Sequence, residues 1–117
     1  MPSKDARTHL QDILESIDHI DEFLQDADID SYLADRKTRS AVERELQIIS
    51  EAAIRLGQKA ETLCPGPDWN NIRGMGNILR HVYHRIDDHI IWNTTQTDLP
   101  PLRQTVLKAL GSTHNLN

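Results

Sequence analysis

The sequence predicts an all-α protein, an antiparallel bundle of four to five helices joined by short loops. Apolar residues recur at steps of three and four in several segments, which is the spacing of one helix face. No stretch alternates polar and apolar residues with a period of two, and valine, which favours strands, is rare. The 117 residues fit a single domain, residues 1–117, because no repeat or low-complexity linker divides them.

The first predicted helix lies near the N-terminus and leads into a short acidic segment. Ser3 or Asp5 could cap its start, because a small polar side chain accepts a hydrogen bond from a free N–H group of the first turn. The acidic stretch at residues 29–33 predicts one or two further turns. The apolar stripe of the first helix consists of Leu10, Ile13, Leu14, Ile17, Ile20 and Leu24.

The second long helix is predicted over residues 42–56. Gly57 stands where it can end this helix, since glycine readily adopts the left-handed conformation of a C-terminal cap. Residues 64–67, Cys-Pro-Gly-Pro, then make the strongest break in the chain, because neither proline fits a helix interior. The stripe of the second helix consists of Val42, Leu46, Ile49, Ala53 and Leu56.

The third long helix is predicted from an Asp68 N-cap to about residue 86. Asp87 and Asp88 then start or kink a further segment. Residues 98–101, Asp-Leu-Pro-Pro, predict another break before a last helix that ends at Gly111, with fraying beyond it. The apolar positions are Ile72, Met75, Leu79, Val82 and Ile86, then Ile90, Ile91 and Trp92, and finally Leu102, Val106 and Leu110.

The predicted core contains few aromatic residues, so extra burial in an oligomer would help it. The chain has 13 Leu and 12 Ile but five aromatic residues in all. No run approaches the length of a membrane span, and the N-terminus has neither a basic nor an apolar leader segment. The single cysteine, Cys64, excludes an intrachain disulfide framework and is expected to be a small buried residue. We therefore expect a cytoplasmic protein without a membrane partner.

The net charge of −5 is unevenly distributed along the chain. Residues 1–35 carry a formal charge of −8, whereas residues 36–117 carry +3. Between Arg73 and Arg85 there are three arginines, two histidines and no acidic residue. Such a strip could bind an anion such as RNA, although charge alone favours solvated helix faces that differ in sign. The acidic first helix is open to two interpretations in the same way, a solvated face or a dock for a basic partner surface.

Polar residues that suit phosphate chemistry share one side of the third long helix. A histidine can act as general acid or base near neutral pH, and an arginine can clamp phosphate oxygens with two hydrogen bonds. Without further support, such a polar face is more often simply solvated. The residues on this side are Arg73, Asn77, Arg80, His81 and His84.

A metal site and a special role for the aromatic residues are not predicted from spacing alone. His81, His84 and Asp88 share a face, but helical di-metal proteins use paired Glu-x-x-His segments, which the sequence lacks. Tyr83 points about 200° away from His81 on an ideal helix, as a packing residue would. Trp69 and Trp92 are most simply packing residues as well.

Residues 69–83 read WNNIRGMGNILRHVY, with a tryptophan, an isoleucine, Gly-Met-Gly-Asn, three further residues and His-x-Tyr. This run resembles the signature of the HepT-like toxins, a branch of the HEPN ribonucleases, in which the four-residue segment is Gly-Met-Arg-Asn. Residues 41–52 are similar to the family helix that ends in Ile-Ile-x-Glu-Ala, and the downstream Ile-Asp, Ile-Trp and Asp-Leu-Pro-Pro-Leu runs match the family ending. The resemblance covers nearly the whole chain.

The resemblance implies a HEPN-like helical bundle that dimerises so that both motifs line one cleft. It also implies an endoribonuclease that needs no metal or other cofactor and uses the 2′-hydroxyl of its RNA substrate. By position, His81 is then the catalytic histidine and Asn77 a polar residue supporting the phosphate, with Arg73 and Arg80 as further phosphate contacts. Tyr83 matches the tyrosine that the cognate antitoxin, an MntA-type minimal nucleotidyltransferase, adenylylates. The resemblance thus implies a toxin of the type VII, or HepT/MntA, toxin–antitoxin class of prokaryotes.

One family residue is missing. The catalytic arginine should stand directly before Asn77 and five positions before His81, where this sequence has Gly76. The change removes five N–H donors and costs about 1 kcal/mol of helix stability relative to alanine. We predict little or no ribonuclease activity, with slight preference for an inactivated toxin over a natural member that has lost catalysis, or over Arg73 or Arg80 replacing the arginine. The alternative function is a non-catalytic helical module that engages a nucleotidyltransferase.

Overall fold

The computed structural model describes residues 4–80 and 87–115, with side chains described within residues 6–79 and 87–111. In these ranges the chain is helical and contains no strand, which confirms the predicted all-α class. No helix in them is long and apolar enough to cross a membrane. The elements are α1 (Lys4–Phe23), α2 (Ile29–Ala34), α3 (Arg36–Leu56), α4 (Gln58–Leu63), α5 (Trp69–Arg80), α6 (Asp88–Asn93), the π-helix η1 (Thr94–Asp98) and α7 (Leu99–Asn115).

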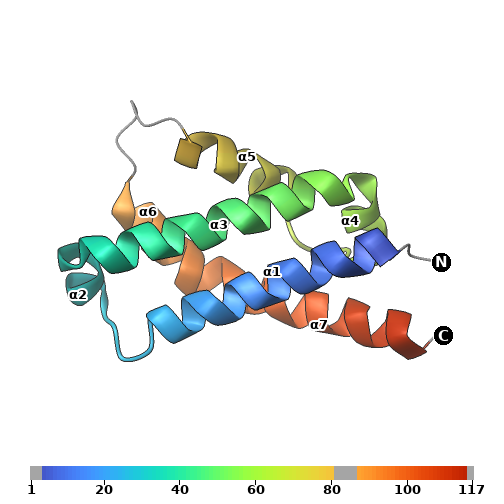
Figure 1. Cartoon of the computed structure of the whole chain (residues 1–117), viewed down its shortest axis with the longest axis horizontal. Coiled ribbons are helices and arrows are strands. Elements are labelled where there is room, and N and C mark those ends of the chain that lie inside the picture. The colour runs from blue at the N-terminus through green and yellow to red at the C-terminus, as the bar shows by residue number, and fades with distance from the viewer. Residues whose placement is uncertain (1–3, 81–86, 116–117) are drawn as a thin grey trace.

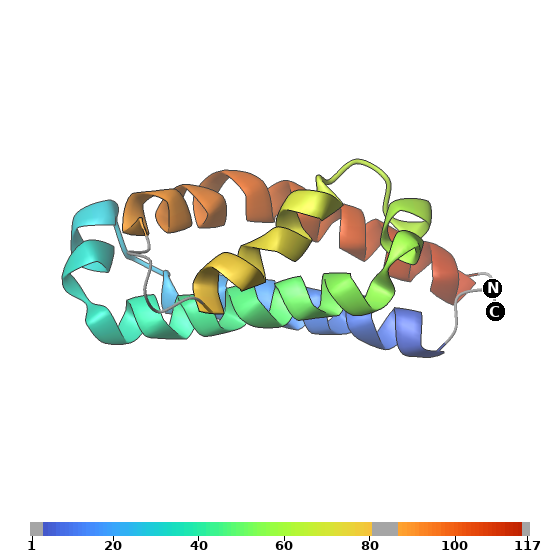
Figure 2. The ribbon, with the colours of Figure 1, turned by 90° about the horizontal axis from the view of Figure 1, so that it is seen from above.

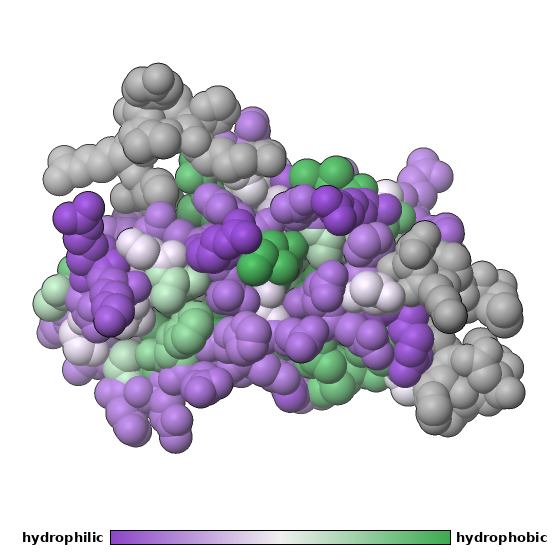
Figure 3. Space-filling view, in the orientation of Figure 1, coloured by the Kyte–Doolittle hydropathy of each residue, from purple (hydrophilic) through white to green (hydrophobic). Residues whose placement is uncertain are grey.

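Four long helices, α1, α3, α5 and α7, form the body of the molecule. Helix α3 packs against α1 along one side and against α5 along another, while α7 packs against α1 (Figure 1). Seen from above, α5 lies nearest the viewer and runs obliquely from the side of α7 to the side of α3 (Figure 2). The molecule is elongated, with principal extents of 46 × 30 × 20 Å. The face of Figure 1 is mostly hydrophilic, with smaller hydrophobic patches between the long helices (Figure 3).

Most residues of the predicted apolar stripes form the core or pack against it. Ile90 is instead 61% exposed, and Val82 and Ile86 lie outside the described residues. Trp69, at the start of α5, is also buried, and its indole Nε1 donates a hydrogen bond to the carbonyl of Cys64 at 2.8 Å. Trp92 packs with its ring 5.4 Å from that of Tyr32, so both tryptophans are packing residues, as predicted. The fully enclosed residues of α1, α3 and α7 include Leu10, Ile13, Ile20, Val42, Leu46, Ile49 and Val106.

Polar caps set most of the helix boundaries. The Asp35 carboxylate accepts from the backbone N–H of Thr38 and starts α3, six residues before the apolar stripe begins. Gly57, with φ of 56°, ends α3, where glycine was predicted. The carboxylate of Asp68 accepts from the N–H of Asn71, as expected of an N-cap.

The predicted break at residues 98–101 is wrong. The chain stays helical from α6 through the π-helix into α7, and the Leu99 N–H bonds to the carbonyl of Thr94, five residues earlier. Pro100 and Pro101 fall in the first turn of α7, where their missing N–H groups are tolerated, and the wider π turn precedes them. Helix α7 also continues past Gly111 to Asn115, and the six-residue helix α4 after Gly57 was not predicted.

Candidate functional site

Helix α5 carries the described part of the motif and runs antiparallel to α3. The side chain of Arg73 reaches the carbonyls of Ala53 and Gly57, whereas Gly76, three residues further along α5, contacts Ser50. Contacts therefore move back along α3 as the chain advances along α5. The Asp68 cap and buried Trp69 hold the first turn of α5 in place.

Arg73 is held by groups of the protein itself. Its guanidinium donates to the Gly57 carbonyl at 2.6 Å, to the Glu61 carboxylate at 2.5 and 3.0 Å, and to Asn70 Oδ1 at 3.1 Å. Its Nε donates to the Ala53 carbonyl at 3.3 Å. The guanidinium also lowers the pKa of the Glu61 carboxyl by hydrogen bonding to the carboxylate. These bonds tie α5 to α4 and to the end of α3, so an RNA phosphate at Arg73 would compete with them.

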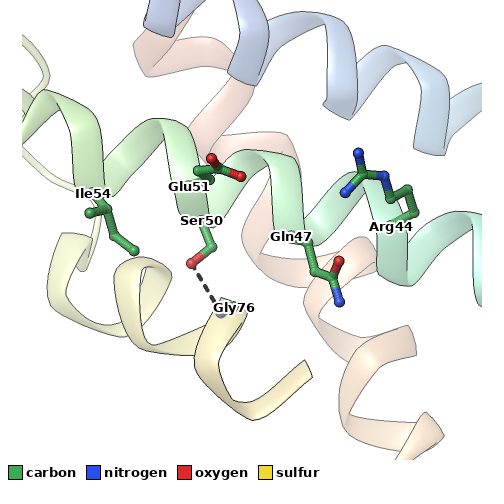
Figure 4. Close-up of a pocket in the computed structure, with 6 residues that line it drawn as sticks. All are labelled: Arg44, Gln47, Ser50, Glu51, Ile54 and Gly76. Atoms are coloured by element: carbon green, nitrogen blue, oxygen red, sulfur yellow. Dashed lines mark hydrogen bonds between the residues drawn. The ribbon is translucent and has the colours of Figure 1, made fainter. Parts of the chain in front are cut away.

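Gly76 is buried where α5 comes closest to α3. Its backbone N–H donates to Ser50 Oγ at 3.0 Å, and the same hydroxyl donates to the Arg73 carbonyl at 2.8 Å (Figure 4). A Cβ atom added at Gly76 would lie 2.5 Å from Ser50 Oγ and 2.9 Å from Ser50 Cβ, which is closer than real Cβ atoms approach. Any side chain at position 76 therefore requires Ser50 or the two helices to move.

Two of the remaining predicted site residues, Asn77 and Arg80, lie in the last four residues of α5. Asn77 follows Gly76 and is exposed. Arg80 is the last helical residue of α5, and its side chain lies outside the described residues, as do His81 and Tyr83 entirely. The structure thus places Asn77 beside Gly76 on the solvent side of the α3–α5 contact, while Arg73 is bound elsewhere.

A small pocket opens beside Gly76, between α3 and α5. Its volume is about 120 Å³, and Ser50, Ile54 and Gln47 point from α3 toward α5 (Figure 4). The contribution of α3 to this site was not predicted from the sequence. A signal was present, because Ser50 is a polar residue that directly follows the buried Ile49 in an apolar stripe and is itself 1% exposed. The lining residues are Arg44, Gln47, Ser50, Glu51, Ile54 and Gly76.

Other groups of chemical interest lie away from this pocket. Burial raises the pKa of the Cys64 thiol to about 11, so this cysteine stays protonated at neutral pH and is a poor nucleophile. Burial and the nearby Asp88 raise the pKa of the Glu43 carboxyl. Among the residues that the structure describes, no three His, Cys, Asp or Glu side chains gather to hold a metal ion.

Comparison with known proteins identifies the family. The Ribonuclease HepT-like family model matches residues 13–109. The chain is 34% identical to the "Probable ribonuclease HepT" of Thermococcus cleftensis over 97 residues, which cover 83% of this chain and 88% of the relative. It is 33% identical to the "Putative RNase MJ1380" of Methanocaldococcus jannaschii over 106 residues, which cover 91% and 97% of the two chains. No solved structure matches the chain significantly. The matched region contains α3, α5 and the whole motif, and the chain therefore belongs to the HepT-like ribonuclease family.

Proposed function

We propose that this protein is the ribonuclease component of a HepT/MntA-type toxin–antitoxin pair and that its own activity is weak or nil. The observation that carries the proposal is the motif on α5. Asn77 is exposed at the end of this helix, and His81 follows in the sequence, whereas position 76 is a glycine packed on Ser50. The motif thus keeps an amide and an imidazole but presents no guanidinium at position 76.

The retained residues suit general acid–base cleavage of RNA without a metal. In this reaction the 2′-oxygen attacks the adjacent phosphorus, the bond to the 5′-oxygen breaks, and a cyclic phosphate forms. His81 would move the proton, and the Asn77 amide would donate to a phosphate oxygen. A guanidinium at position 76 would stabilise the charge that develops on the phosphate, and losing such a donor lowers rates by about a hundredfold or more.

The contact between Gly76 and Ser50 bears on the origin of the glycine. The Ser50 hydroxyl bonds to two backbone groups of α5, and this arrangement needs a residue without a Cβ at position 76. A serine and a glycine that fit each other support a natural member with reduced catalysis. They give less support to an inactivated toxin in which only the arginine at position 76 was replaced. The sequence alone slightly favoured that explanation.

The partner in this proposal is an MntA-type minimal nucleotidyltransferase, and the working form is a homodimer whose two motifs line one cleft. Adenylylation of Tyr83 would add negative charge and bulk two residues from His81, which would repel the RNA backbone. Co-expression with a nucleotidyltransferase encoded beside this gene should raise the intact mass by one adenylyl group. A Tyr83→Phe variant should show no increase, and an equal increase in that variant would contradict the assignment.

A non-catalytic module that engages the nucleotidyltransferase is the second candidate, and the Gly76–Ser50 contact supports it because position 76 then carries no catalytic guanidinium. The two candidates differ in whether catalysis can be restored. We therefore test the Ser50→Gly/Gly76→Arg protein on total RNA in the presence of EDTA, with the same protein carrying His81→Ala as control. Cleavage that depends on His81 supports the ribonuclease, and equal cleavage with His81→Ala would refute it. A correctly folded paired variant without any cleavage would favour the binding module.

A further inference from the structure

One side of α3 borders the polar side of α5. On an ideal helix successive residues are rotated by about 100° around the axis. Four residues of α3 therefore lie about 40° to 120° around the axis from Ser50 in one direction, namely Ile54, Gln47, Glu51 and Arg44. The buried residues Leu46, Ala53 and Ile49 lie in the other direction. We call the first set the outer stripe of α3. Ser50, Ile54 and Gln47 point toward α5, whereas Arg44 and Glu51 lie at the outer edge of the stripe and extend away from α5 (Figure 4).

The polar side of α5 lies on the same side of the Ser50–Gly76 contact. Asn77, about 100° from Gly76 in one direction, is exposed, whereas Leu79, about 60° in the other direction, is buried. Because the helices are antiparallel, the solvent-facing sides of both border one groove, and the pocket beside Gly76 lies in it. Arg44 lies about 9 Å beyond Ser50 along α3, toward the end at which α5 finishes with Arg80.

Arg44 carries a positive charge that the described residues leave uncompensated. No ion pair or hydrogen bond of its side chain occurs within residues 6–79 and 87–111. The helix neighbours three and four positions away are Ser40, Ala41, Gln47 and Ile48, none of which is acidic.

The other charges near the pocket are paired within the protein. The Glu51 carboxylate bonds to Arg55 at 2.8 Å, and the Arg73 guanidinium bonds to Glu61. Arg39 pairs with Asp88 at 3.5 Å. Arg44 is therefore the cation of the outer stripe that is available for an external anion.

We propose that Arg44, whose exposed side chain can turn toward α5, binds a phosphate of the RNA backbone at the rim of this groove. A long and unpaired guanidinium on α3 then supplies the phosphate clamp that position 76 does not carry. The proposal rests on the ribonuclease function proposed above. Arginine suits this role because its planar group can give a phosphate two parallel hydrogen bonds.

The test measures RNA binding as a function of salt. The probe is a short fluorescent single-stranded RNA with 2′-O-methyl riboses, which cannot be cleaved through its 2′-oxygen, and anisotropy gives Kd over a series of KCl concentrations. Wild type, Arg44→Gln, Arg44→Lys and Lys108→Gln are compared. Lys108 is an exposed cation on α7, so its variant makes the same charge change away from the pocket. Thermal melting by circular dichroism verifies that each protein is folded.

Arg44→Gln should weaken binding roughly tenfold and reduce the slope of log K against log salt by about 0.7 for each phosphate that the variant no longer binds. Arg44→Lys should recover the salt slope and part of the affinity, and Lys108→Gln should match wild type. Equal affinity and slope for Arg44→Gln and wild type would overturn the role of Arg44 while leaving the ribonuclease proposal intact. Weaker binding with an unchanged slope would also overturn it, because a merely structural effect leaves the number of neutralised phosphates the same. A wild-type protein that binds no RNA would overturn both proposals.

Discussion

Two glycines of α5, Gly74 and Gly76, should respond in opposite ways to the same substitution. Both are in the same helix, two residues apart, and neither has a positive φ. A Cβ at Gly74 meets nothing within 4 Å, whereas a Cβ at Gly76 meets Ser50 Oγ at 2.5 Å. The local helix preference is thus alike at the two positions, and the contact with α3 is the difference.

The magnitudes follow from these distances. Alanine at position 74 should raise the free energy of unfolding by about 1 kcal/mol, the usual gain over glycine in a helix. Alanine at position 76 has the same gain, but forcing Ser50 aside costs about 1 to 3 kcal/mol as overpacking. Ser50 then also loses its bond to the Arg73 carbonyl, at about 1 kcal/mol. The two alanine variants should therefore differ by roughly 2 to 4 kcal/mol, with Gly76→Ala below wild type.

The assay is urea unfolding of wild type, Gly74→Ala and Gly76→Ala, followed by circular dichroism. A second series carries Ser50→Gly, which removes both atoms that a Cβ at position 76 would meet. In that background Gly76→Ala should lose most of its penalty, with a coupling free energy of about 1 kcal/mol or more. If Gly76→Ala stabilises the protein as much as Gly74→Ala does, or if Ser50→Gly leaves its effect unchanged, the argument from the contact is refuted.

Two further predictions concern ion pairs that join helices. Replacing Arg73 by Met should lower the free energy of unfolding by about 2 kcal/mol, because the carbonyls of Ala53 and Gly57 lose a donor along with Glu61; an unchanged urea midpoint would contradict this. Hydrogen bonding to Glu45 raises the pKa of His19, so this pair stabilises the fold below the ordinary histidine pKa of 6.5 and loses its effect as pH rises through the folded pKa. Wild type should therefore lose more stability between about pH 6 and about pH 8 than His19→Gln, and equal losses would exclude the effect.

Helix identity was predictable from the sequence because it depends on local periodicity. The stripes of α1 and α3, the caps at Gly57 and Asp68, and the start of a further segment at Asp87 or Asp88 were predicted from spacing and cap chemistry, and the structure confirms them. The break predicted at residues 98–101 is absent from the structure. The prediction assumed that prolines interrupt a regular helix, and it did not allow for a π turn before them.

The composition of the site was predictable only on α5. Gly76 and Asn77 stand out as positions in a motif, but the fit of Gly76 to Ser50 depends on a contact between residues 26 positions apart, which no local pattern reports. The same holds for Arg73, whose acceptors lie on α3 and α4. Arg44 is unremarkable in the sequence and becomes relevant once the antiparallel packing of α3 and α5 places it beside the groove.

Our proposal is that the Gly76–Ser50 pair keeps the ribonuclease motif inactive. Its most direct test is the initial rate of RNA cleavage by four proteins. These are wild type, Ser50→Gly, Gly76→Arg and the paired variant, measured on total RNA in EDTA after their folding has been checked. We expect cleavage by the paired variant about a hundredfold or more above wild type, with neither single variant reaching it. Wild-type protein that cleaves as fast as the paired variant would contradict the account.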